Sequence, residues 1–152
     1  MKLKELLELW LERYMKHTIK SRTYNRYKSI CDLHLIKDLG EYELEELKPN
    51  VLQDFLLKKI DENYSTNTIK GIVSVLKQAL RLAITLEFVD KEYCSNLKMP
   101  SSEEKEISVF TKKEQQIIES FCLNHKKSNY IGIVICLYTG IRLGELLALT
   151  WD

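Results

Sequence analysis

The feature that most constrains the fold of this chain is a long, regular spacing of apolar residues near its middle. Apolar side chains recur every three or four residues at Ile69, Ile72, Val73, Leu76, Leu80, Ala83 and Ile84. That spacing puts them along one side of an α-helix. Ser65 precedes the pattern, and its hydroxyl is suited to accept a backbone hydrogen bond at a helix start. The segment therefore predicts a long amphipathic helix that buries one side.

Similar spacing predicts further helices before this one. They cover about residues 3–17, 22–34 and 49–61. Ser21 is the expected cap of the second of these helices, Gly40 the expected turn residue after it, and Pro49 the first residue of the third. Glycine and proline are scarce, with 5 and 2 residues. The chain is therefore expected to be mainly α, with a bundle of four to five helices in its first part.

A change in composition marks a domain boundary at residues 99–106, where proline, serine and unbroken charge follow each other. We expect residues 1–98 to form the helical bundle, residues 99–106 a linker, and residues 107–152 a second, α-rich segment. In that segment, residues 107–110 are expected to form a short strand and residues 130–138 an apolar helix. Between them, Thr111 and Glu114 fit a capping box. The helix after the box is expected to turn these residues inward: Ile117, Ile118, Phe121 and Cys122.

Charge is distributed unevenly, although the net charge is only +1. Residues 13–31 carry six cations and residues 63–86 carry three, and neither stretch contains an acid. Lys70, Lys77 and Arg81 fall on one side of the long helix. Such segregation indicates a basic face that meets an anionic partner. The alternative, that these are solvated faces balanced by acids on neighbouring helices, remains open from the residues alone.

Other classes of protein have little support in the sequence. No apolar run is long enough to span a membrane, and the first residues lack the apolar core of a signal peptide. We therefore expect a cytoplasmic protein. The four cysteines and three histidines show no spacing typical of a metal site. Buried free thiols are the expected state of the cysteines, and no metal is expected.

The end of the chain holds an arginine in an unusual place. Gly140 is expected to end the apolar helix in a left-handed conformation, and a new helical pattern starts directly after it. Arg142 then falls at the start of that helix, where a cation opposes the helix dipole. Two interpretations stay open: Arg142 only pairs with Glu145, or its planar fork grips an anion such as phosphate.

The residue types around Arg142 carry a family resemblance. Thr-Gly-x-Arg-x-Gly-Glu-Leu-x-x-Leu-x-Trp, from Thr139 to Trp151, resembles the first catalytic-arginine box of the tyrosine recombinases, the phage and conjugative-transposon integrases. Residues 1–100 resemble the family's core-binding, SAM-like domain, through such stretches as Ile19-Lys20-Ser21-Arg22-Thr23-Tyr24. Residues 107–114 resemble the start of the catalytic domain. The similarity thus covers essentially the whole chain.

The resemblance implies a function and a set of residues. It implies that the first domain is one half of a clamp around duplex DNA. Its second and fourth helices are expected to approach the major groove, with contacts mostly to phosphate. The implied contacts are Lys20, Arg22, Thr23, Arg26, Asn67, Lys70, Lys77 and Arg81. In the family a tyrosine attacks the scissile phosphate, so Arg142 is implied as a phosphate ligand and Glu145 as the acid that orients it. No metal or nucleotide cofactor is implied.

The family's later catalytic residues, including its nucleophilic tyrosine, are not found before Asp152. We therefore expect a catalytically incomplete chain with a truncated catalytic domain, unable to cleave DNA alone. We also expect self-association or poor order of the second segment, because apolar residues there lack covering partners. These are Tyr130, Ile133, Ile135, Leu137, Leu146 and Leu147. Two alternatives remain: a non-enzymatic DNA-binding regulator derived from an integrase, and a helical protein-interaction module.

Overall fold

The computed structural model describes residues 1–91, 94–101, 108–125 and 127–150. The chain divides into two compact units, Met1–Glu103 and Glu104–Asp152. The division falls inside the segment predicted as a linker. Most of that segment, residues 102–106, lies outside the described residues, so the linker itself remains a prediction.

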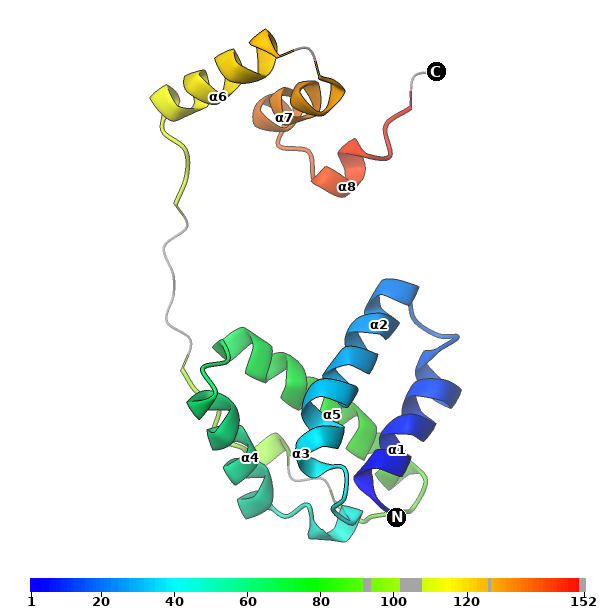
Figure 1. Ribbon diagram of the computed structural model, residues 1–152. Helices are drawn as coiled ribbons and strands as arrows, with labels where there is room; N and C mark the ends of the chain where they lie inside the picture. The colour runs from blue at the N-terminus through cyan, green and yellow to red at the C-terminus, as the bar shows by residue number, and fades with distance from the viewer. Residues whose placement is uncertain (92–93, 102–107, 126, 151–152) are drawn as a thin grey trace. The chain divides into compact units, whose positions relative to one another are not determined.

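The first unit is a bundle of helices (Figure 1). Its elements follow one another as α1 (Leu3–Leu9), the π-helical η1 (Trp10–Met15), α2 (Ser21–Ile30), the π-helical η2 (Cys31–Ile36), α3 (Lys37–Leu39), the 3-10 turn η3 (Leu44–Glu46), α4 (Pro49–Asp61), α5 (Thr66–Thr85) and the 3-10 turn η4 (Cys94–Asn96). The backbone stays helical from α1 into η1 and from α2 through η2 to α3, so each set forms one continuous helix. The prediction of a mainly helical bundle is confirmed.

The core of this unit forms around α5, which spans 20 residues. Its predicted apolar stripe is buried from Ile69 to Ala83, while Ile84 at the end is half-buried. Leucines of α1, η2 and α4 pack into the same core. Burying one leucine side chain contributes about 2 kcal/mol, so this shared core is the main stabilising contact of the bundle.

Local signals mark the starts of α4 and α5. The Ser65 hydroxyl accepts a hydrogen bond from the Thr68 backbone N–H at 3.2 Å, and Pro49 occupies the first turn of α4, as predicted. The predicted cap at Ser21 is wrong. Lys20 holds the extended cap position with ψ 142°, and Ser21 is already the first helical residue. No side chain makes a capping hydrogen bond at this helix start.

Gly40 closes the turn after α3, as predicted. A Cβ on Gly40 would lie 2.4 Å from the carbonyl oxygen of Ile36, far inside van der Waals contact. Only glycine therefore fits without displacing the backbone. The chain then passes through η3 into α4.

The second unit contains α6 (Lys112–Asn124), α7 (Ser128–Thr139) and α8 (Leu143–Leu146) (Figure 1). The capping box of Thr111 and Glu114 is present, with the Thr111 hydroxyl 3.3 Å from the Glu114 backbone N–H. Gly140 ends α7 with a φ of +67°, the left-handed conformation predicted for it. Among the described residues, no helix is long and apolar enough to cross a membrane.

Two predictions for this unit are wrong. Residues 108–110 form no strand, and Ile107 lies outside the described residues. A strand requires a paired neighbour, whereas Val109 and Phe110 are exposed. On α6, Cys122 is buried and Ile118 half-buried as expected, but Ile117 and Phe121 are 70% and 51% exposed. Tyr130 of α7 lies edge-on to the Phe121 ring at 5.6 Å but covers only part of this side of α6.

Candidate nucleic-acid interface

The orientation of α2 is set by aromatic side chains that face the first helix. The Tyr27 ring stacks on Trp10 with 5.5 Å between centroids. The Tyr24 hydroxyl donates a 2.8 Å hydrogen bond to Glu12. These contacts turn one side of α2 toward η1, and another side of α2 packs against α5. What remains is a solvent-facing surface that carries the helix's cations.

The predicted contacts on α2 lie on that surface. Lys20, Arg22 and Arg26 are exposed, and Thr23 is half-buried at the start of the helix. No ion pair involves these three cations within the described part of the chain. By contrast, Lys28 on the same helix pairs with Asp32 at 3.3 Å.

The predicted DNA contacts on α5 also face the solvent, in whole or in part. Asn67 and Lys70 are exposed in its first turns, Arg81 is exposed further on, and Lys77 between them is partly exposed. The ion pairs of the described residues include none of the three cations. We define the basic face as Lys20, Arg22, Arg26, Lys70, Lys77 and Arg81.

Many of the unit's acids are neutralised elsewhere. Glu41 pairs with Lys2 at 2.6 Å, and Glu12 pairs with Lys16 at 2.6 Å. Asp38 pairs with Lys58 at 2.6 Å. Because the basic face has no such partners, its positive charge is directed to the solvent, where it attracts anions.

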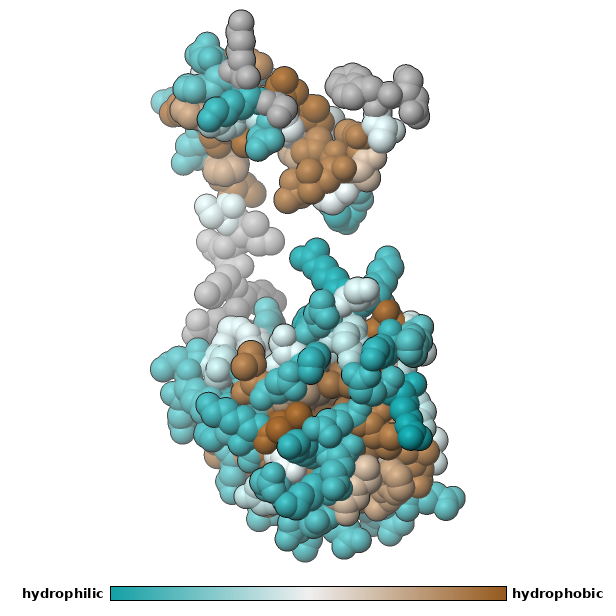
Figure 2. Space-filling model, turned by 45° about the vertical axis from the view of Figure 1, so that its right-hand side comes forward, coloured by the Kyte–Doolittle hydropathy of each residue, from teal (hydrophilic) through white to brown (hydrophobic). Residues whose placement is uncertain are grey.

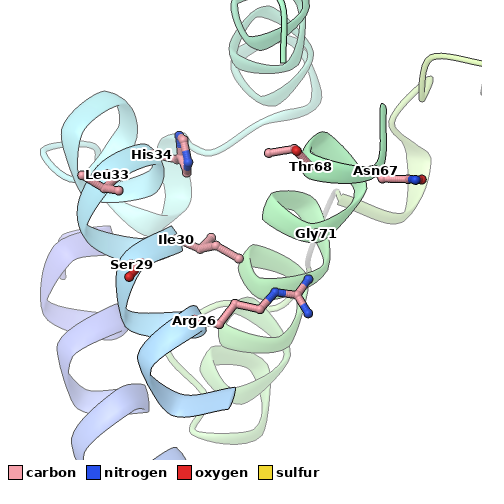
Figure 3. Close-up of a pocket in the computed structure, with 8 residues that line it drawn as sticks. All are labelled: Arg26, Ser29, Ile30, Leu33, His34, Asn67, Thr68 and Gly71. Atoms are coloured by element: carbon pink, nitrogen blue, oxygen red, sulfur yellow. The ribbon is translucent and has the colours of Figure 1, made fainter. Parts of the chain in front are cut away.

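A groove runs between the helices that carry the basic face (Figure 3). It has a volume of about 540 Å³. Its walls come from α2, η2 and α5: Arg26, Ser29, Ile30, Leu33, His34, Asn67, Thr68 and Gly71. Figure 3 shows Arg26 reaching toward α5, with His34 and Thr68 facing each other across the groove.

Sequence reasoning found Arg26 and Asn67 but missed Ser29, His34, Thr68 and Gly71. Helical spacing gave a signal for Ser29, because it lies three residues after Arg26 on the same side of the helix. It gave no signal for Gly71, which enters the groove only because α5 packs beside α2.

A buried ion cluster next to the groove was also missed. Lys59 is 2% exposed, and its Nζ lies 2.7 Å from both Asp38 and Glu62. Burial opposes the charge of Lys59, but hydrogen bonds to the two carboxylates outweigh burial and raise the pKa of Lys59. Tyr64 lies edge-on to the ring of His34 at 5.0 Å, so the cluster adjoins the groove wall.

Arg142 and Glu145 lie in the second unit and contact each other. Arg142 occupies the cap position of α8, so it stands just before the first turn. Its Nη1 lies 3.3 Å from Oε1 of Glu145, and its backbone N–H donates to Oε2 of the same carboxylate at 3.1 Å. The Arg142 side chain is 86% exposed. The guanidinium is thus oriented by Glu145 and open to a ligand. Trp151, the last residue of the motif, lies outside the described residues.

The second unit also exposes apolar surface, which Figure 2 shows as a cluster of hydrophobic side chains. A groove of about 730 Å³ lies between α7 and the segment containing α8. Ile131, Leu143 and Leu147 in its lining are 59%, 67% and 77% exposed. Surface of this kind is typical of a contact site.

Comparison with known proteins finds similarity to integrases and tyrosine recombinases. Residues 2–60 match the family described as phage integrase, N-terminal SAM-like domain. An integrase of Saccharopolyspora erythraea is 26% identical over 144 residues, which cover 93% of this chain and 32% of the relative. A tyrosine recombinase XerC-like protein of Caldanaerobacter subterraneus subsp. tengcongensis is 26% identical, covering 97% of this chain and 39% of its own length. The chain spans about a third of these relatives.

Solved structures show the same fold. The integrase-like domain from Bacillus cereus is 26% identical, with a TM-score of 0.63 over 71% of this chain and 91% of its own. The Tn1549 transposon integrase in complex with transposon right end DNA has a TM-score of 0.82 at 21% identity. That likeness covers 99% of this chain and 48% of the integrase, so the shared fold extends beyond the first unit.

Proposed function

Since this chain is a member of the phage integrase family of tyrosine recombinases, we propose that it binds duplex DNA. It acts as the DNA-binding portion of a site-specific recombinase of a phage or mobile element. The observation that carries the proposal is the basic face, whose six cations make no ion pair among the described residues. The solved Tn1549 integrase complexes, in which a protein of the same fold holds DNA, support it.

The contacts proposed are mostly to phosphates. The cations of the basic face attract the DNA backbone, while Thr23 and Asn67 are short polar groups that donate hydrogen bonds to phosphate oxygens. Such contacts set the register and orientation of the protein on the duplex. They supply affinity that depends steeply on salt, because each neutralised phosphate releases counterions.

Duplex binding by the whole chain, followed by fluorescence anisotropy at several salt concentrations, tests this function. We expect the logarithm of the affinity to fall linearly with the logarithm of salt concentration, with a slope of about −0.9 per phosphate contacted. Absence of duplex binding at low salt contradicts the proposal. Binding to an acidic protein without binding to DNA supports the protein-interaction alternative instead.

We further propose that Arg142 is a ligand of the scissile phosphate and that Glu145 orients it. The exposed guanidinium, paired with Glu145 at 3.3 Å, supports this role. A guanidinium fork suits phosphate oxygens, and such electrostatic contacts stabilise charge during phosphoryl transfer. Nitrogen-15 NMR of the Arg142 side chain during a DNA titration tests it. Resonances that stay unchanged at saturating DNA contradict the role.

The apolar groove of the second unit supports self-association as a further proposal. A second copy of the chain covers the exposed leucines and removes apolar surface from water. Sedimentation velocity of the wild type is expected to show a concentration-dependent dimer, and Leu147→Glu a monomer. Leu57→Glu, at a 49% exposed position of the first unit, is the matched control and keeps the dimer. If the wild type stays monomeric at all concentrations, self-association through this groove is rejected.

A cytoplasmic location accompanies the DNA-binding proposal, since the partner DNA is found there. Cell fractionation tests it, and recovery of the chain in a membrane fraction contradicts it.

A further inference from the structure

A glycine in the middle of α5 faces the groove beside Arg26. Gly71 lies six residues into a helix of 20 residues, where glycine is a poor helix former. A Cβ built on Gly71 would lie 3.2 Å from Nη2 of Arg26, tighter than ordinary contact. Within 4 Å of that point, no other atom from the described part of the chain is found beyond the helix's own backbone and Gly71's neighbours. Among the described residues, the Arg26 guanidinium is therefore the group outside the helix that a side chain at residue 71 would meet first.

Arg26 is the cation best placed in this groove. Figure 3 shows its side chain crossing from α2 toward α5, next to Gly71. The Thr68 hydroxyl already shares a 2.8 Å hydrogen bond with Ser65, and Figure 3 shows the Asn67 amide directed away from α2. No carboxylate pairs with Arg26 within the described residues. Its guanidinium is thus the permanently charged group that the groove lining offers to an anion.

We propose that Gly71 is a positioning residue for Arg26. By leaving the α5 side of the groove open, it lets the guanidinium lie across α5 and bind one phosphodiester of duplex DNA between the two helices. This inference rests on the proposed function. A larger side chain at residue 71 would displace the guanidinium from this position, so affinity depends on the space at residue 71 as well as on the charge of Arg26.

Four variants of the whole chain test the proposal by duplex binding at several salt concentrations: Arg26→Gln, Gly71→Ala, Gly71→Gln and the double variant Arg26→Gln/Gly71→Gln. Arg26→Gln is expected to lower the salt slope by about one and the low-salt affinity by about tenfold. Gly71→Gln removes no charge, yet it is expected to lower the slope by nearly as much, because it displaces the guanidinium.

The double variant supplies the matched control. If Gly71 acts through Arg26, Gly71→Gln weakens binding in the wild type and has no further effect once Arg26 is glutamine. Gly71→Ala separates positioning from folding. Alanine favours a helix interior, so the melting temperature is expected to stay equal or rise while DNA affinity falls about two- to threefold.

Distinct results identify each failure. A wild type that does not bind duplex DNA defeats the proposed function. A wild type that binds while Gly71→Ala and Gly71→Gln bind with unchanged affinity and slope overturns the positioning role alone. Equal losses from Gly71→Gln with and without Arg26 also overturn it, because the glycine then acts independently of the guanidinium.

Discussion

Lys59 Nζ lies 2.7 Å from Oδ2 of Asp38, and the two side chains are 3% and 7% exposed. The pair joins the last turn of α4 to α3. Glu62 adds a second carboxylate at 2.7 Å from the same ammonium, and the rings of Phe55 and Tyr64 lie 5.6 and 5.4 Å from it. The cluster fixes the turn before α5, and with it the side of the groove formed by the start of α5.

Removing this buried cation is expected to destabilise the first unit strongly. Lys59→Met leaves Asp38 buried beside a single exposed lysine, and breaking a buried pair typically costs about 3–5 kcal/mol. Urea unfolding followed by Trp10 fluorescence in a Trp151→Phe background measures the change. Lys58→Met is the control, since Lys58 is 52% exposed and Lys59 still pairs with Asp38 in that variant, so a smaller loss is expected. Equal losses of unfolding free energy in Lys59→Met and Lys58→Met contradict the stabilising role of the buried Lys59.

His34 is expected to make stability depend on pH. Burial of the imidazole, and then the nearby Lys59 ammonium, lower the pKa of His34, although Asp38 and Glu62 partly oppose this. The unfolded state therefore binds this proton more readily than the folded state. The contribution of neutral His34 is complete above the ordinary histidine pKa of about 6.5 and is lost as pH falls through that value toward the lower folded pKa.

The measurement is the free energy of unfolding at about pH 7.5 and pH 5.5, on either side of the ordinary histidine pKa. We expect the wild type to lose stability at the lower pH and His34→Gln to lose less. The pKa values of Asp38 and Glu62 are lowered, so the stability that these carboxylates contribute is lost only in more acidic solution. An unchanged pH dependence in His34→Gln rejects the prediction.

The Ser65 cap is expected to stabilise α5. Ser65→Ala removes the acceptor for the Thr68 backbone N–H and costs about 1 kcal/mol. Ser29→Ala, an exposed serine inside α2, is the control, since alanine is the better helix former there. Urea unfolding that shows no difference between the two variants contradicts the capping role.

Much of the fold was predictable because it depends on neighbours in sequence. The stripe of α5, the caps at Ser65 and Thr111, and the left-handed Gly140 each follow from a few adjacent residues. The errors have tertiary causes. Lys59 resembles a surface lysine in sequence, and only the return of the chain past Asp38 makes its burial favourable. Phe121 fits an apolar helix face, yet it stays 51% exposed because the rings of His125 and Tyr130 cover only part of it.

Some parts of the candidate site could likewise be predicted from sequence neighbours, whereas others depend on tertiary packing. Acid-free stretches identified the cations of the basic face, because charge segregation is visible along the chain. The groove required α2 and α5 to lie together, so the role of Gly71 was not accessible from spacing. The orienting contact between Arg142 and Glu145 was predictable, since three residues separate them at a helix start.

The most direct test of the account compares two triple variants of equal charge in duplex binding at several salt concentrations. One removes Arg22, Lys70 and Lys77 from the basic face, and the other removes Lys4, Lys37 and Lys48, each replaced by glutamine. All three control lysines are exposed and make no ion pair among the described residues. We predict that the first variant lowers the salt slope by about three and the second leaves it near the wild-type value. Equal losses in both variants would contradict a localised DNA-binding face.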